Sequence, residues 1–169
     1  MKRVMVIGCG GAGKSTFSKK LGEITNLEVI HLDQHYWNPN WTESTPDEWS
    51  KVVASLAEKP EWIMDGNYGG TMDIRIPKAD TIIYLDFSSF KCLWRITKRI
   101  IKYKGKQRPD MTIGCHERFD LEFYHYVATY NLVRRKKLLE KINRFKNDKE
   151  ILVFKSDQET AAYLRKLQS

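Results

Sequence analysis

The sequence has few of the residues that stabilise secreted domains or span membranes. It contains three cysteines, Cys9, Cys92 and Cys115, and no C-x-x-C pair, which argues against a disulfide framework and for a reducing compartment. No apolar run approaches the roughly 20 residues that a membrane-spanning helix needs. Residues 1–3 lead directly into an apolar run of strand length, which leaves no room for a signal peptide. We therefore expect a cytoplasmic protein.

Two motifs of other protein classes are also missing. Cys115, His116 and His125 lack the closing pair of ligands that a zinc site needs, so we predict no metal there. The chain has no Asn-Lys-x-Asp string that reads guanine, and residues 147–149 carry similar residues in the wrong order. This argues against a regulatory GTPase.

The most informative segment is the apolar run Val4–Ile7, which leads into Gly-x-x-x-x-Gly-Lys-Ser and a helix-compatible stretch. This strand–loop–helix pattern predicts a P-loop, in which glycines let successive amides point into one concavity toward phosphate oxygens. Lys14 supplies a positive charge for the β- and γ-phosphates, and Ser15 supplies a hydroxyl for Mg²⁺. The predicted ATP-binding residues are Gly8, Cys9, Gly10, Gly11, Ala12, Gly13, Lys14, Ser15 and Thr16.

Charge is unevenly distributed along this single predicted domain, 1–169. The whole chain has a net charge of +8. Residues 31–90 hold 4 Lys/Arg and 10 Asp/Glu (net −6), whereas residues 91–146 hold 16 and 5 (net +11). The basic segment favours an arginine clamp for the phosphates of a nucleotide, together with a solvated helix face. Binding of nucleic acid or of membrane phosphates is the alternative.

Apolar runs of strand length alternate with helical patterns along the chain. The predicted strands are Val4–Ile7, Glu28–Leu32, Glu61–Met64, Thr81–Asp86 and Ile151–Phe154. Such continuous apolar strands predict a three-layer α/β fold with a parallel sheet covered on both faces. Ligands of these sheets bind at the carboxyl ends of strands, where the P-loop, Asp33, Asp65 and Asp86 fall.

Helix signals lie between these runs. The clearest is the capping box at residues 45–48, which predicts a helix that buries Trp49, Val52, Val53 and Leu56 and ends before Pro60. The other predicted helices span about 13–24, part of 67–76, a segment after Ser88 or Ser89, about 116–145 with one break, and the C-terminal residues. The helix after Ser88 or Ser89 carries Phe90, Leu93, Trp94, Thr97 and Ile101. Residues 34–41 are predicted to form an aromatic loop.

Two aspartates at strand ends are candidates for the chemistry. Asp65 can hold Mg²⁺ through water, facing Ser15, or serve as a turn or helix-capping residue. Asp33 can accept the proton of a hydroxyl that is phosphorylated. If the acceptor is itself a phosphate, no base is needed, and Asp33 would bind Mg²⁺-bound water or a sugar hydroxyl. The aromatic side chains of Tyr36, Trp37 and Trp41 either stack on a substrate ring or pack in the protein.

Arginines in the basic segment are candidates for stabilising transferred charge. Arg95 and Arg99 lie one helical turn apart, followed by Arg108 and Arg118. Arginine forks stabilise the charge on phosphoryl oxygens better than lysine does. We expect residues of about 102–118 to form a basic lid that excludes water. The run 134–137 goes around its helix, and part of it is expected to be solvated surface.

These features resemble the nucleoside-monophosphate-kinase group of P-loop kinases. Residues 65–68, Asp-Gly-Asn-Tyr, resemble the Asp-Gly-Phe-Pro-Arg segment of adenylate kinases, and residues 80–86 resemble their fourth strand. Residues 94–99 and 117–120 resemble their two lid-arginine segments. More closely, the chain resembles small bacterial adenylate-kinase-related proteins known as topology-modulation (FlaR-type) proteins. That match lies in His31–Asp33, Asp65–Tyr68, Cys92–Arg95, Arg108–Met111 and Asp120–Phe123.

The resemblance implies a five-stranded parallel sheet ordered 2-3-1-4-5 and an ATP- and Mg²⁺-dependent transfer of the γ-phosphoryl to a nucleotide or other small acceptor. It also suggests an alternative, an ATP-binding, nucleic-acid-associated protein that modulates DNA topology through its basic middle segment. The catalytic residues that it implies are Lys14, Asp33, Arg95, Arg99 and Arg118, with Ser15 and Asp65 as metal ligands.

The chain departs from adenylate kinases where they bind AMP. Tyr68-Gly69 replaces their Pro-Arg, so the acceptor need not be AMP, and Arg75 is the candidate to replace the missing arginine. Asp33 with its aromatic segment also resembles kinases of hydroxyl acceptors, such as the uridine-kinase type. We expect a substrate-binding insert at about 34–60, and the predicted substrate-binding residues are Asp33, Tyr36, Trp37, Asn67, Tyr68 and Arg75.

Overall fold

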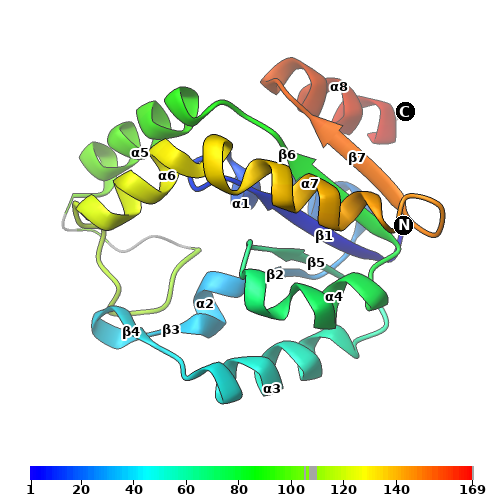
Figure 1. Ribbon diagram of the computed structural model, residues 1–169, viewed down its shortest axis with the longest axis horizontal. Coiled ribbons are helices and arrows are strands. Elements are labelled where there is room, and N and C mark those ends of the chain that lie inside the picture. Colours follow the sequence, from blue (N-terminus) through cyan, green and yellow to red (C-terminus); the bar gives the residue numbers. More distant parts are fainter. Residues whose placement is uncertain (105, 107–109, 169) are drawn as a thin grey trace.

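A five-stranded parallel sheet forms the centre of the protein (Figure 1). The computed structural model describes residues 1–104, 106 and 110–168. The sheet order is β2 (Val29–His31), β5 (Trp62–Asp65), β1 (Arg3–Gly8), β6 (Thr81–Leu85) and β7 (Glu150–Phe154). Counted along the chain within this sheet, the order is 2-3-1-4-5, which confirms the predicted topology. All residues of β5 and β6 are buried, as expected for strands covered on both faces.

Helices cover both faces of this sheet. They are α1 (Lys14–Thr25), α2 (Leu32–Tyr36), α3 (Pro46–Ala57), α4 (Met72–Lys78), α5 (Ser89–Tyr103), α6 (Leu121–Val133), α7 (Arg135–Asn143) and α8 (Asp157–Gln168). The helices α1 and α8 contact each other. Helix α4 packs against β1 and also against α3. In Figure 1, α7 lies in front of the sheet and α1 behind it. Among the described residues, no helix combines the length and apolarity that crossing a bilayer requires.

The predicted helix starts are confirmed where capping signals are strong. Thr45 and Glu48 form the reciprocal capping box of α3, which ends before Pro60, and the Ser88 hydroxyl caps α5. Trp49 is buried as predicted, but Val52 is 36% exposed. The three cysteines are free thiols, as their spacing indicated.

The buried face of α5 does not include its largest apolar side chains. Phe90 and Trp94 are 83% and 57% exposed, whereas Cys92 and Ile96 are fully buried. The buried face packs against the P-loop, where a Cβ on Gly11 would lie 2.5 Å from the carbonyl oxygen of Cys92. A close approach of two backbones selects small or slender side chains, so the largest apolar residues do not mark this interface.

Two irregular segments also differ from the prediction. The expected aromatic loop consists of α2, the antiparallel pair β3 (Trp37–Asn38) and β4 (Thr42–Glu43), and a 3-10 turn (Pro39–Trp41). Asp33 therefore lies in the first turn of α2. The helical region expected from residue 116 begins at α6, because the Asp120 carboxylate accepts a hydrogen bond from the amide of Phe123 and caps the helix there. It breaks once, at Arg134, as predicted.

Candidate active site

A cleft of about 1710 Å³ lies at the carboxyl ends of the strands. It brings together most of the residues predicted for the site, namely Gly10, Gly11, Ala12, Gly13, Lys14, Ser15, Thr16, Asp33, Trp37, Asp65, Asn67, Tyr68, Arg95, Arg99 and Arg118. Gly8, Cys9, Tyr36 and Arg75 do not line it. The carboxyl-end rule for parallel sheets thus located the cleft correctly.

The P-loop has the tight path that its glycines predict. A Cβ on Gly8 would lie 2.8 Å from the carbonyl oxygen of Leu85, and Gly13 has a φ of +91°. Lys14 Nζ donates hydrogen bonds of 3.1 Å to the carbonyl oxygens of Gly8 and Cys9, which holds its charge over the loop. The loop therefore fits a polyphosphate, because its amides and one ammonium group face the same cleft.

Asn67 braces this loop from the end of β5. Its Oδ1 accepts a 2.9 Å hydrogen bond from the amide of Gly8. Its Nδ2 donates to the hydroxyls of Tyr126 (3.3 Å) and Tyr130 (3.4 Å) on α6. The sequence analysis assigned Asn67 to the substrate, whereas these contacts give it a part in connecting the P-loop, β5 and α6.

Asp33 is held by a neighbouring tyrosine. The Tyr68 hydroxyl donates a 2.5 Å hydrogen bond to Asp33 Oδ1. Burial and the charge of Asp33 raise the pKa of Tyr68 far above its usual range, so this hydroxyl stays protonated and a donor. The Tyr68 ring lies 4.8 Å from the rings of both Tyr36 and Trp49, and Tyr36 belongs to this aromatic cluster instead of to the cleft surface. Packing therefore orients Asp33 toward the cleft.

Asp65 pairs with a histidine that the sequence analysis missed. The parallel register places His31 of β2 opposite Asp65 of β5, and His31 Nδ1 lies 2.7 Å from Asp65 Oδ2. Burial opposes protonation of His31, but the hydrogen bond and charge of Asp65 outweigh it and raise the pKa of this histidine. The adjacent strand end was the available signal for His31, because polar residues that end neighbouring strands meet at one edge.

The two histidines of this region should titrate in opposite directions. We expect the pKa of His31 to lie above the ordinary value of 6.5 and that of His35 below it, because burial and the charge of Lys59 disfavour protonated His35. The contribution of His31 to stability is complete below the unfolded-state pKa and is lost as the pH rises through its raised folded-state pKa. NMR titration of both imidazoles without added Mg²⁺ measures this. Asp65→Asn should lower the pKa of His31 and leave His35 unchanged; a His31 pKa at or below 6.5 in the wild type contradicts the pairing.

Arg75 does not line the cleft, although the sequence predicts that it binds substrate. Its side chain is fully buried. The guanidinium donates hydrogen bonds to the carbonyl oxygens of Gly66 (3.1 Å), Asn67 (2.6 Å) and Tyr68 (3.1 Å). Burial lowers its pKa to about 10. Arg75 therefore stabilises the turn after β5 through these three carbonyl oxygens, from a position outside the cleft.

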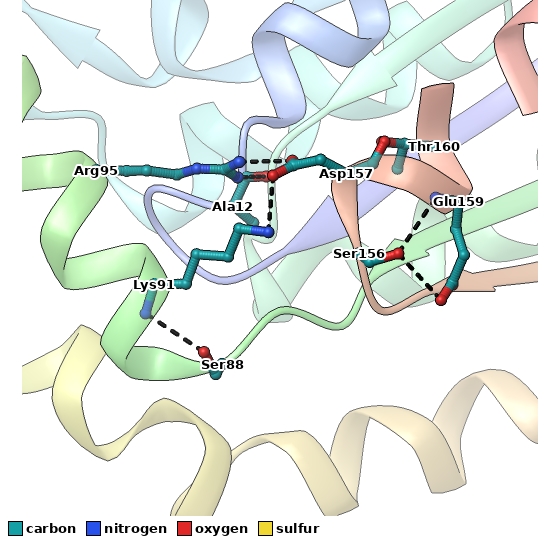
Figure 2. Close-up of polar contacts among 8 residues, drawn as sticks. All are labelled: Ala12, Ser88, Lys91, Arg95, Ser156, Asp157, Glu159 and Thr160. Carbon is teal, nitrogen blue, oxygen red and sulfur yellow. Dashed lines mark hydrogen bonds and ion pairs between the residues drawn. The ribbon is translucent and has the colours of Figure 1, made fainter. Parts of the chain in front are cut away.

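The arginines of the predicted clamp surround the cleft and contact protein groups. Figure 2 shows Arg95, which donates to the carbonyl oxygen of Ala12 (3.1 Å) and to Asp157 Oδ1 (2.5 Å), with Lys91 Nζ 2.7 Å from Asp157 Oδ2. Burial alone would raise the pKa of Asp157, but the hydrogen bonds from Lys91 and Arg95 outweigh it and lower this pKa. Asp157, which follows the carboxyl end of β7, was not among the residues predicted for the site.

The other two arginines also contact protein groups. Arg99 donates through Nε and Nη2 to Glu117 Oε1, at 3.1 and 2.9 Å. Arg118 lies over the Trp41 ring, 5.4 Å from its centroid. Arg108 lies outside the described residues. Among the described residues, no three or more His, Cys, Asp or Glu side chains are grouped so as to hold a metal ion.

Comparison with known proteins identifies the fold. No protein-family model and no curated protein matches the chain. Shikimate kinase from Bacteroides thetaiotaomicron is similar at a TM-score of 0.58 and 17% identity, over 99% of this chain and 96% of that one. A shikimate kinase from Acinetobacter baumannii in complex with shikimate (TM-score 0.59, 13% identity, 99% and 90% coverage) and a gluconokinase from Sinorhizobium meliloti 1021 (0.54, 14%, 99% and 89%) are also similar. The chain thus has the fold of P-loop kinases along nearly its whole length, and the resemblance to topology-modulation proteins stays a prediction.

Proposed function

We propose that this protein is an ATP- and Mg²⁺-dependent kinase that transfers the γ-phosphoryl of ATP to a hydroxyl of a small acceptor. The observation that carries this proposal is the arrangement of one cleft: the P-loop with Lys14 lines it together with Asp33, which Tyr68 orients. Proteins similar in fold include kinases named for shikimate and gluconate, which supports a small-molecule acceptor. We infer a single domain, 1–169, with its acceptor-binding insert at about 34–60 and its lid at about 102–118.

Different residues of the chain have different roles in the proposed phosphoryl transfer. The P-loop amides and Lys14 bind the phosphates, and Arg95, Arg99 and Arg118 approach the transferred group when the lid closes. Mg²⁺, which would neutralise phosphate charge when bound, fits the oxygen donors of Ser15 and Asp65, because it takes few protein ligands beside the phosphates of its substrate. Asp33 accepts the proton of the attacking hydroxyl.

Asp33→Asn tests the assignment of the proton acceptor. Asparagine keeps an oxygen for the hydrogen bond from Tyr68 but cannot take a proton, so we expect kcat to fall by about 10²- to 10⁴-fold. Glu43→Gln is the matched control, since this carboxylate also lines the cleft and accepts a 2.9 Å hydrogen bond from a tyrosine, Tyr36. Similar losses in both variants, or none in Asp33→Asn, would show that Asp33 only positions a ligand.

A screen of ATP consumption tests the proposed function as a whole. Nucleosides, nucleoside monophosphates and small hydroxyl metabolites are offered with ATP and Mg²⁺, and formation of ADP is measured. We expect stimulation by at least one class, and no stimulation by any compound would refute the proposal. The comparisons give no support to the DNA-topology alternative, and a duplex-binding titration against salt would detect it through a steep fall in affinity.

A further inference from the structure

Four consecutive cationic side chains, residues 134–137, take different directions where α6 meets α7. Arg135 forms a two-pronged ion pair with Asp86, with both N–O distances at 2.7 Å. Lys136 points outward, with 86% of its side chain exposed, and lies 4.0 Å from Glu140 one turn along the same helix. Arg134 and Lys137 line the cleft. Within the described part of the chain, neither of these two has a carboxylate partner.

The two cleft-lining cations belong to the half of the cleft that the acceptor would occupy. The sheet order places β2 and β5, with Asp33 and Asp65 at their ends, on one side of the P-loop strand and β6 and β7 on the other. Lys141, one turn beyond Lys137, pairs with Asp73 of α4 at 2.8 Å, so α7 crosses toward the element that follows β5. The pair of Arg135 with Asp86 holds the start of α7 near the end of β6, and Lys137 lies between that anchor and the Lys141–Asp73 pair, where the helix crosses toward the half that contains Asp33.

Contacts with an aromatic side chain position Arg134 in the same half. Its guanidinium lies 4.5 Å from the centre of the Tyr126 ring. The Tyr126 hydroxyl in turn accepts the hydrogen bond from Asn67, at the end of β5. A guanidinium held over a ring keeps its planar fork available at low cost in conformational entropy.

Carboxylates on the opposite wall have their own partners. Asp33, Asp65 and Glu43 bond to Tyr68, His31 and Tyr36, respectively. On the side of α6 and α7, an anion entering this half would meet a guanidinium and an ammonium group, the two protein groups that bind phosphate and carboxylate most strongly.

We propose that the acceptor carries an anionic group, a phosphate or a carboxylate, in addition to the hydroxyl that is phosphorylated, and that Arg134 and Lys137 bind this group. The inference rests on the proposed function for the identity of the cleft, and it narrows the acceptor to anionic hydroxyl compounds. Neutral nucleosides and neutral sugars are then poor substrates.

Anion binding tests the proposal without turnover. The protein is saturated with a non-hydrolysable ATP analogue and Mg²⁺, and inorganic phosphate or malonate is titrated by calorimetry. We expect Lys137→Gln to weaken binding about tenfold or more, because a hydrogen bond to a charged group is worth over one power of ten. Lys136→Gln, which removes the same charge from the outer face, should leave it unchanged. If inorganic phosphate binds more tightly than malonate, the anionic group of the acceptor is a phosphate; if malonate binds more tightly, it is a carboxylate. The proposal is overturned if neither anion binds to the wild type or if both variants bind equally.

Kinetics separates the acceptor from the nucleotide. Hydroxyl compounds are compared in pairs that differ only in the anionic group, and we expect a lower KM for the charged member. Lys137→Gln and Arg134→Gln should raise the KM for that acceptor about tenfold and leave the KM for ATP unchanged. A raised KM for ATP alone would assign these cations to the nucleotide and overturn the inference. If no acceptor stimulates ATP consumption, the proposed function fails, and the calorimetric result still decides whether the anion site exists.

Discussion

Lys14→Ala is expected to lower kcat by about 10³-fold, because this ammonium is the cation of the P-loop and no other residue of the loop carries a positive charge. The fold should persist. Lys14 Nζ bonds to two loop carbonyls in a half-buried position, and the loop backbone keeps its other contacts. We expect the free energy of unfolding to change by less than about 1 kcal/mol. ADP formation and urea unfolding of the same preparation measure both effects.

The control for this prediction is a lysine outside the cleft. Lys51→Ala removes an exposed charge from α3 and should leave kcat and stability as in the wild type. If Lys14→Ala keeps full activity, the P-loop is not the ATP site and the proposed function is wrong. If instead the variant unfolds, the lysine is a structural element and its loss of activity carries no information on catalysis. Binding of a fluorescent ATP analogue to the folded variant then distinguishes lost affinity from lost turnover.

Arg75→Met should produce the largest loss of stability among the variants considered. It leaves the carbonyl oxygens of Gly66, Asn67 and Tyr68 without their donor in a buried site. Each such group costs about 1–3 kcal/mol, and relief from burying the charge of the guanidinium offsets part of the sum. We expect a net loss of about 2–4 kcal/mol and a fall in Tm of about 5–15 °C. Thermal unfolding followed by circular dichroism measures it.

A neighbouring cation supplies the control. Lys78→Met removes a charge from the same helix, where the side chain forms a surface ion pair with Glu58, and should cost less than about 1 kcal/mol. Arg75→Lys should lie between the two, because an ammonium cannot reach all three carbonyls. If Arg75→Met were as stable as the wild type but raised the KM of the acceptor, the original sequence prediction of a substrate-binding role would be correct.

Local sequence patterns were sufficient for the features that depend on neighbours along the chain. The P-loop follows from glycine and lysine spacing within residues 8–16, and the start of α3 follows from the capping box at 45–48. The central strands β1, β5 and β6 were recognisable because they are buried on both faces and form continuous apolar runs. The sheet order came from the resemblance to nucleoside-monophosphate kinases and not from the strand pattern itself. The position of the cleft then followed from the carboxyl-end rule alone.

Contacts between segments distant in the sequence determined the partners of the site residues and the packing face of α5. Arg75 and Lys137 are both cations within helices, but one is buried under a turn and the other lines the cleft. His31 meets Asp65 only through the register of two strands that lie 34 residues apart. The face of α5 that packs on the P-loop is determined by the close approach of the α5 backbone to the backbone of the loop. The sequence determines which bonds each side chain can form. Only the tertiary structure determines which partner lies within bonding distance, because that depends on the packing of the whole chain.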